Sequence, residues 1–434
     1  MNIQDLPTEL LHNIIGFVAE DDHLRKPPPE REEPEFSDDE EGWRRYEEEP
    51  EPWDILDWSD LVEVCLVSRK FRDLAQPFLF RKFKDLSVIG LGKTYSFTAT
   101  LCRRPDLGRS VDHIYLDPNY EPPYCINFFA GNNTVLALLL SKTPNLRSLR
   151  LPGGQFSYQP IDLLYGRDPL YLSNLKILWV ECEQMSRKHD ISKAERLVTL
   201  PKLELASFSG GKLSGALFPS TWTEKSVNAN LLQFTMCHID RDALPKLTQA
   251  CKSLNSLTYK SYNTGADFSS SGVEFNAAQA YEALLPHKNT LEVLAISCYR
   301  ASQQNENIQN YTQVKIGPLD DFYKLKTIFL PHNMLPAHPV FSGSLEELTI
   351  SDCRSSIRNI VQNIATDAHD GQYPTLAKFR ILTPNENAAL GPLGGSNGRT
   401  FLDCYHSLSA IFSGCKPPVD FTVSHTDRLG YVMF

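Results

Sequence analysis

Residues 345–350 read Leu-Glu-Glu-Leu-Thr-Ile, and the spacing of their three apolar residues recurs along most of the chain. In each copy of six residues, apolar residues occupy the first, fourth and sixth positions. Neighbouring copies start between 20 residues (Leu325 to Leu345) and 37 residues (Leu254 to Leu291) apart. Side chains alternate between the two faces of an extended strand, so each copy predicts a short strand with one buried face. The ten copies are Val111/Ile114/Leu116, Leu146/Leu149/Leu151, Leu175/Leu178/Val180, Leu203/Ala206/Phe208, Leu231/Phe234/Met236, Leu254/Leu257/Tyr259, Leu291/Leu294/Ile296, Leu325/Ile328/Leu330, Leu345/Leu348/Ile350 and Leu376/Phe379/Ile381.

This irregular repeat is similar to leucine-rich repeats, which contribute one strand and one helix or turn each. The resemblance implies an α/β fold, a curved solenoid with parallel strands inside and helices outside. Room for helices exists between several copies, and we expect them at residues 135–140, 244–251, 277–285 and 357–364. The alternative for the same region is a parallel sheet with crossover helices in an enzyme.

A different pattern opens the chain. Asp5-Leu6-Pro7-Thr8-Glu9 has the composition of a helix start, because proline suits the first turn and acidic residues favour the positive end of the helix dipole. The apolar residues that follow fill two adjoining stripes, which is more than a small three-helix module needs for its interior. We therefore expect a helix over residues 6–18 that also offers a partner surface.

Two further helices are expected after a gap. Ser59 or Asp60 begins one of them, with Glu63 placed as in a capping box, and Ser68 caps the next. The third helix is expected to end near Pro77, because proline breaks helices.

Leu6-Pro7-x-Glu9-Leu10, Asp60-Leu61 and the run from Leu66 to Ala75 resemble the two halves of the F-box motif. The resemblance implies a small helical bundle that binds a Skp-family adaptor and, through it, a cullin scaffold. Residues 97–111 also look like the link between F-box and repeats in fungal F-box proteins. The adaptor contact that the resemblance implies comprises Leu6, Pro7, Leu10, Leu11, Ile14, Leu61, Val64, Val67 and Phe71.

The gap between the two halves departs from the family pattern, which usually has a short turn there. Residues 21–57 hold sixteen Asp or Glu against five Lys or Arg, and six prolines. Like-charge runs and prolines oppose a packed core, so we expect a disordered acidic insertion. The expected domains are an F-box module at 1–85 interrupted by this insertion, a linker helix region at 86–110, and the repeat array at 111–434.

Composition narrows the class of protein. The 434 residues are 41% hydrophobic and 22% charged, which is ordinary for a folded protein. The formal charge of -10 comes from the insertion, whose net charge is -11, so the remainder has a net charge of +1. A uniform basic surface is absent, and no apolar run reaches the length of a membrane span. We expect an intracellular protein of cytoplasm or nucleus, with neither nucleic acid nor membrane as a partner.

Sequence signals for catalysis or cofactors are weak. The ten cysteines are scattered, which favours reduced and mostly buried thiols over disulfides or zinc ligands. Gly90-Leu91-Gly92-Lys93-Thr94 resembles the end of a P-loop, but Ser87 stands where the first glycine is required. We therefore expect no cofactor, no metal site and no catalytic residues.

A target protein would meet the concave face of the array, where side chains between the buried strand positions point. Seven large side chains occupy such positions: Arg150, Ile177, Trp179, Lys260, Phe329, Lys378 and Arg380. Five of them, Arg150, Trp179, Lys260, Phe329 and Arg380, are the expected target-binding residues, because aromatic and arginine side chains often anchor interfaces. Trp179 and Phe329 are explained equally well as core residues beneath a long loop.

The sequence thus favours a non-catalytic substrate-recognition adaptor of a Skp-cullin-F-box ubiquitin ligase. One alternative is an interaction scaffold that does not direct degradation. A hydrolase hidden in the repeat region is a further alternative, and it would require a pocket with a convergent nucleophile and base.

Overall fold

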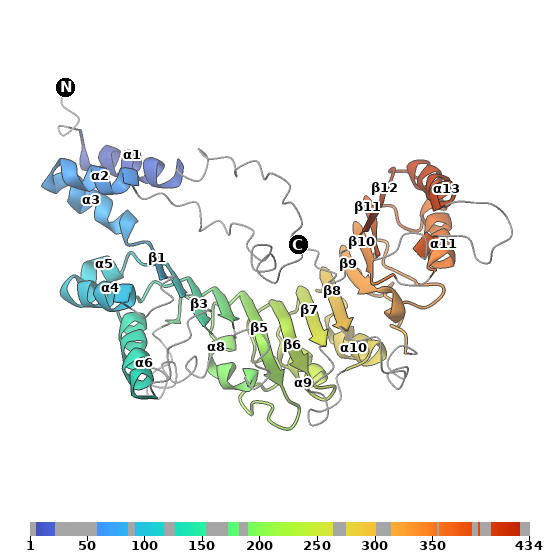
Figure 1. The fold of residues 1–434 in the computed structure, drawn as a ribbon, viewed down its shortest axis with the longest axis horizontal. Helices are drawn as coiled ribbons and strands as arrows, with labels where there is room; N and C mark the ends of the chain where they lie inside the picture. Colours follow the sequence, from blue (N-terminus) through green and yellow to red (C-terminus); the bar gives the residue numbers. More distant parts are fainter. Residues whose placement is uncertain are drawn as a thin grey trace, which may run out of the picture.

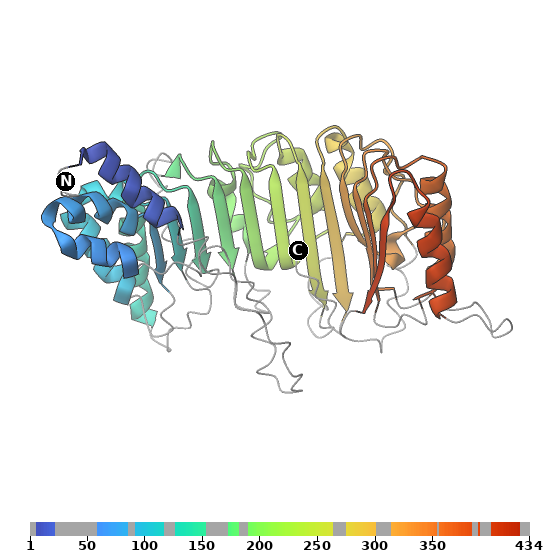
Figure 2. The same cartoon turned by 90° about the horizontal axis from the view of Figure 1, so that it is seen from above.

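The computed structural model shows a mixed α/β protein whose centre is one long parallel sheet (Figure 1). Helices lie along one side of this sheet, and the ribbon bends so that the helices are outside and the strands inside. A small group of helices precedes the first strand (Figure 2). The structure describes residues 6–21, 59–85, 92–116, 126–152, 172–181, 190–263, 275–300, 314–353, 356–383, 389–390 and 401–425.

The sheet has twelve strands, and their order in space is their order in the chain. Each strand pairs in parallel with the next, and β1 and β12 lie at opposite ends, so the sheet is not closed. The strands are β1 (Lys82–Asp85), β2 (His113–Leu116), β3 (Ser148–Pro152), β4 (Ile177–Glu181), β5 (Leu205–Leu213), β6 (Leu231–Ile239), β7 (Ser256–Asn263), β8 (Val293–Arg300), β9 (Thr327–Pro331), β10 (Glu347–Ser351), β11 (Lys378–Thr383) and β12 (Asp420–His425).

Each of the ten copies falls on a strand, from β2 to β11, and nine of them have the predicted register. The copy Leu231/Phe234/Met236 was wrong by two residues, because Ala229, Leu232 and Phe234 are the buried set on β6 and Met236 has a positive φ of 55°. In β10, Leu348 and Ile350 point into the core, while Leu345 is buried in the turn before the strand. The register stacks equivalent residues across the sheet, so that Leu348 lies between Ile328 and Phe379. Because such ladders run the length of the sheet, one continuous apolar core joins the repeats.

Two strands were not predicted, because each departs from the pattern. In β1 the third apolar position is taken by Asp85, which is buried and accepts hydrogen bonds from the Thr94 N–H (2.9 Å) and hydroxyl (2.6 Å). At β12, the apolar residue Val419 just before the strand and Phe421 and Val423 within it alternate with period two instead. The array therefore begins and ends outside the predicted repeats.

The expected helices are present, with shifted ends. The ranges 135–140, 244–251, 277–285 and 357–364 correspond to α6, α9, α10 and α11. The third helix ends near Pro77 as predicted, at Leu79, since a proline in the last turn removes only one hydrogen bond. The α-helices are α1 (Thr8–Asp21), α2 (Ser59–Val67), α3 (Arg69–Leu79), α4 (Gly92–Arg103), α5 (Pro105–Gly108), α6 (Ile126–Ser141), α8 (Glu195–Val198), α9 (Ala243–Ala250), α10 (Ala277–Leu284), α11 (Arg358–His369) and α13 (Phe401–Ser413), with short 3-10 helices η4 (Ile191–Ala194), η5 (Leu285–His287) and η7 (His332–Met334).

The described cysteines carry free thiols, and most of them are buried. Burial raises the pKa of Cys251 to about 12 and also raises the pKa of Cys353, whereas Cys102 lies on the surface. A raised pKa keeps the reactive thiolate scarce at pH 8. We expect iodoacetamide to alkylate Cys102 in the native protein and Cys251 only after unfolding, as read by peptide mass spectrometry. Equal labelling rates of these two residues in the native protein would contradict this packing.

Candidate protein-docking surface

The helices α1, α2 and α3 pack into a small module ahead of the sheet (Figure 2). Ser68 separates α2 from α3 and caps the latter, since its extended backbone (φ -161°) lets the hydroxyl accept the Phe71 N–H at 3.2 Å. The Lys70 ammonium group donates to the Leu6 carbonyl at 3.3 Å and ties the start of α1 to α3. The buried interior of the module consists of Leu11, Ile15, Leu61, Phe71 and Ala75.

Apolar side chains also project outward from α1 and α2. Leu10 and Ile14 stand one helical turn apart on α1 and are 50% and 44% exposed. On α2, Val62 and Leu66 stand one turn apart, and Leu66 and Val67 are 81% and 61% exposed. We call these five residues the outer stripes. Fully burying one such side chain is worth about 1.5–3 kcal/mol, so a partner that covers the stripes would gain substantial free energy.

The structure divides the nine residues of the expected adaptor contact into two groups. Pro7, Leu10, Ile14 and Val67 are exposed, and Leu6 and Val64 are half-buried. The other three, Leu11, Leu61 and Phe71, lie in the interior of the module, where they hold the helices together. A motif match gives residue types at fixed spacing and does not separate these two roles.

Val62 and Leu66 belong to the outer stripes but were not among the residues predicted from the sequence. Their one-turn spacing on α2 was a usable signal, since residues four apart share one face of a helix. Leu61 and Leu66 are both apolar, and only the packing of α2 on the other two helices shows that Leu61 points inward.

The expected target-binding residues all lie on the side of the sheet away from the core, which we call the inner face. Arg150 pairs with Glu181, and Arg380 is exposed. Burial lowers the pKa of Lys260. Phe329 is only 4% exposed and packs with Ala295 and Leu382 in a small separate cluster. Its role is therefore packing, and it is not an exposed anchor for a partner.

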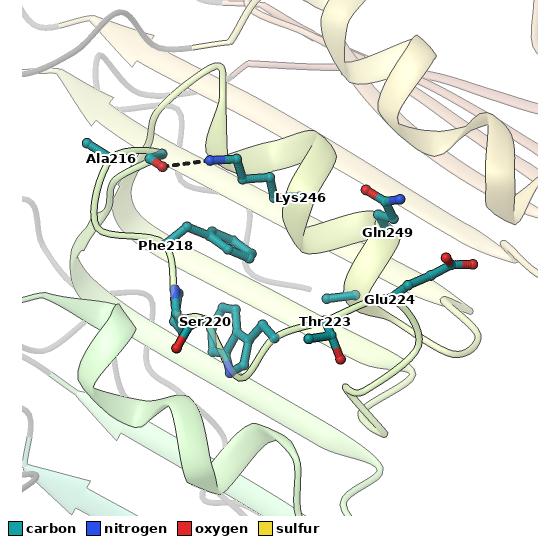
Figure 3. Close-up of a pocket in the computed structure, with 11 residues that line it drawn as sticks. Ala216, Phe218, Ser220, Thr223, Glu224, Lys246 and Gln249 are labelled. Atoms are coloured by element: carbon teal, nitrogen blue, oxygen red, sulfur yellow. Dashed lines mark hydrogen bonds between the residues drawn. The ribbon is translucent and has the colours of Figure 1, made fainter.

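A pocket of about 410 Å³ lies on the outer side, between the loop after β5 and helix α9 (Figure 3). Lys246 donates to the Gly215 carbonyl at 2.8 Å, and the Phe218 ring stands edge-on to Trp222. The lining residues include the hydroxyl groups of Ser220 and Thr223 but neither histidine nor cysteine. A nucleophile and an imidazole base are therefore not brought together in this pocket.

A second polar cluster lies where β5 and β6 end. The His238 imidazole is 3.0 Å from one carboxylate oxygen of Asp240, and the Lys212 ammonium is 3.7 Å from the same oxygen. The other oxygen accepts the Gly215 N–H at 3.3 Å. Asp240 thus fastens the loop after β5 to the start of α9, which gives the cluster a structural role.

The chain matches no protein family model and no curated protein sequence. Among the described residues, no helix is long and apolar enough to cross a bilayer, and no group of three metal-ligating side chains gathers.

Proposed function

We propose that this chain is the substrate-recognition subunit of a Skp-cullin-F-box ubiquitin ligase. In this proposal α1, α2 and α3 form the F-box and dock a Skp-family adaptor, which links the chain to a cullin. The observation that carries the proposal is the exposure of the outer stripes on a module whose interior is formed by other apolar residues. Exposed apolar patches of this kind mark protein-interaction sites.

In the second part of the proposal, the sheet and its helices form a leucine-rich-repeat solenoid that holds the target protein. Two observations support this interpretation over a doubly wound enzyme sheet. The strand order never reverses, whereas a doubly wound sheet reverses its order at the ligand site. The helices α6, α9 and α10 lie on one side only, which leaves the inner face to a partner (Figure 1).

The activity that follows is proximity rather than chemistry. A subunit that binds the ligase at one end and a target at the other raises the local concentration of target near the ubiquitin-transfer enzyme. The chain itself then contributes no catalytic residue, metal or cofactor to the reaction.

Affinity purification of the tagged full chain, co-expressed with a Skp-family adaptor and a cullin, tests the proposal. We expect all three to elute together at equal stoichiometry from size exclusion. A chain that elutes alone would refute it. If the complex assembles but proteasome inhibition does not change the abundance of any protein bound to it, the result would favour the non-degradative scaffold.

The acidic insertion allows a separate prediction. Because closing a loop twice as long costs only about 0.6 kcal/mol more, the insertion should leave the assembly of α1 with α2 nearly unaffected. Replacing residues 22–57 with a Gly-Ser linker of half their length should therefore change the Kd for the adaptor by less than about threefold, as measured by calorimetry. A gain of tenfold or more would mean that the insertion obstructs docking.

A further inference from the structure

The inner face is not chemically uniform, and its first four strands differ from the rest. One ladder of paired residues there runs Lys84, Tyr115, Arg150 and Trp179, from β1 to β4. Their neighbours Phe83, Ile114, Leu149 and Leu178 are buried in the core, which places the ladder on the opposite face. Cationic and aromatic side chains therefore alternate across four adjacent strands.

The contacts within this ladder are ordered. The Lys84 ammonium lies 5.0 Å and the Arg150 guanidinium 4.4 Å from the centre of the Tyr115 ring. Cations over an aromatic face are attracted by its quadrupole. Arg150 is also paired with Glu181. Both cations are thereby held in place, and a partner that meets preordered side chains loses less entropy on binding.

Charge distinguishes this end of the inner face from the other. On β1 to β4 it carries three cations, Lys82, Lys84 and Arg150, against the single anion Glu181. On β9 to β12 two cations, Lys378 and Arg380, face two anions, Glu347 and Asp420. The positive excess is thus larger on the first four strands than on the last four.

His113 lies on the same part of the inner face, beside Lys82. Burial and the nearby cations, Lys82 among them, lower the pKa of His113 to about 4 although Asp112 opposes the shift. The imidazole is therefore neutral near pH 7. His113 therefore leaves the charge balance of the first four strands unchanged.

We propose that the inner face of β1 to β4 binds a short extended segment of the target protein that carries carboxylate side chains beside an aromatic one. This proposal rests on the proposed function, since it names the part of the target that the solenoid holds. Carboxylates would pair with Lys84 and Arg150, and the aromatic side chain would lie against Trp179.

The dimensions of the surface fit a peptide. Adjacent strands are about 4.8 Å apart, so the four strands span roughly 14 Å, which an extended peptide crosses with about four or five residues. A nucleic acid is the less suitable occupant, because the chain outside the acidic insertion has a net charge of only +1.

Fluorescence anisotropy with the full chain tests this proposal. The probe is a short fluorescein-labelled peptide of repeating Glu-Glu-Tyr triplets, compared with its Gln-Gln-Tyr counterpart and with a labelled oligo-dT. Lys84→Glu reverses the charge of the ladder, and Lys84→Gln is a milder variant in case the first fails to fold. The matched control is Lys225→Glu, an exposed lysine on the loop that precedes β6.

We expect the acidic peptide to bind at least about tenfold more tightly than the amide peptide, Lys84→Glu to weaken it about tenfold or more, and Lys225→Glu to leave it unchanged. Equal losses in the Lys84 and Lys225 variants, no binding by the unmodified chain, or tighter binding of oligo-dT would each overturn the proposal. The Lys84 variants should retain the adaptor, so failure here and failure of the proposed function are separate results.

Discussion

The double variant Leu10→Lys, Val67→Lys is expected to lose association with the Skp-family adaptor, with a Kd at least about a hundredfold higher. Both side chains lie on the outer stripes, 50% and 61% exposed, so lysine is accommodated in the free protein. In a complex each lysine would have to bury its ammonium group, and each leaves an apolar contact worth about 1.5–3 kcal/mol unmade. Calorimetric titration with purified adaptor measures the loss.

Leu217→Lys is the matched control for this experiment. Leu217 is 64% exposed, on the loop after β5 and far in sequence from the helical module, and the substitution has the same chemistry. It should leave the affinity for the adaptor unchanged. If both variants bound as tightly as the unmodified chain, the outer stripes would not be the docking surface.

Gly108→Ala is the substitution expected to have the largest effect on stability. Gly108 ends α5, and a Cβ atom placed there would lie 2.2 Å from the carbonyl oxygen of Lys142, just after α6. Backbone must shift to relieve such a contact, because neither partner is the tip of a flexible side chain. Overpacking of this severity costs about 3 kcal/mol or more. We expect a markedly lower Tm in thermal unfolding.

Gly92→Ala is the corresponding control, because a Cβ atom at this position meets nothing within 4 Å. Gly92 is the first residue of α4, where alanine is at least as favourable as glycine. Its Tm should equal or slightly exceed that of the unmodified chain. Identical Tm values for the two alanine variants would contradict the close approach of α5 to the end of α6.

Much of the fold could be predicted from the sequence, because its strands repeat one local pattern. The spacing of Leu345, Leu348 and Ile350 specifies a strand and its buried face without reference to the rest of the chain. The ends of the array could not be found this way. Asp85 occupies a core position only because Thr94, nine residues later, satisfies its carboxylate.

The candidate sites were less accessible to sequence reasoning, because exposure depends on packing. Leu10 and Leu11 are adjacent and chemically identical, yet one lies on the surface and the other in the interior of the module. Likewise, Trp179 and Phe329 occupy the same inner-face ladder, but Phe329 is buried against Ala295 and Leu382. The grouping of Lys84, Tyr115 and Arg150 could not be predicted from the sequence, because only the strand register places these three residues side by side.

Hydroxyl-radical footprinting of the full chain, with and without a purified Skp-family adaptor, tests the central claim most directly. The proposal predicts strong protection of Leu10, Ile14, Leu66 and Val67 in the complex. Leu217, equally apolar and exposed, should be oxidised at the same rate in both states. Unchanged oxidation of the four outer-stripe residues at saturating adaptor would contradict the assignment of this module as the ligase-docking surface.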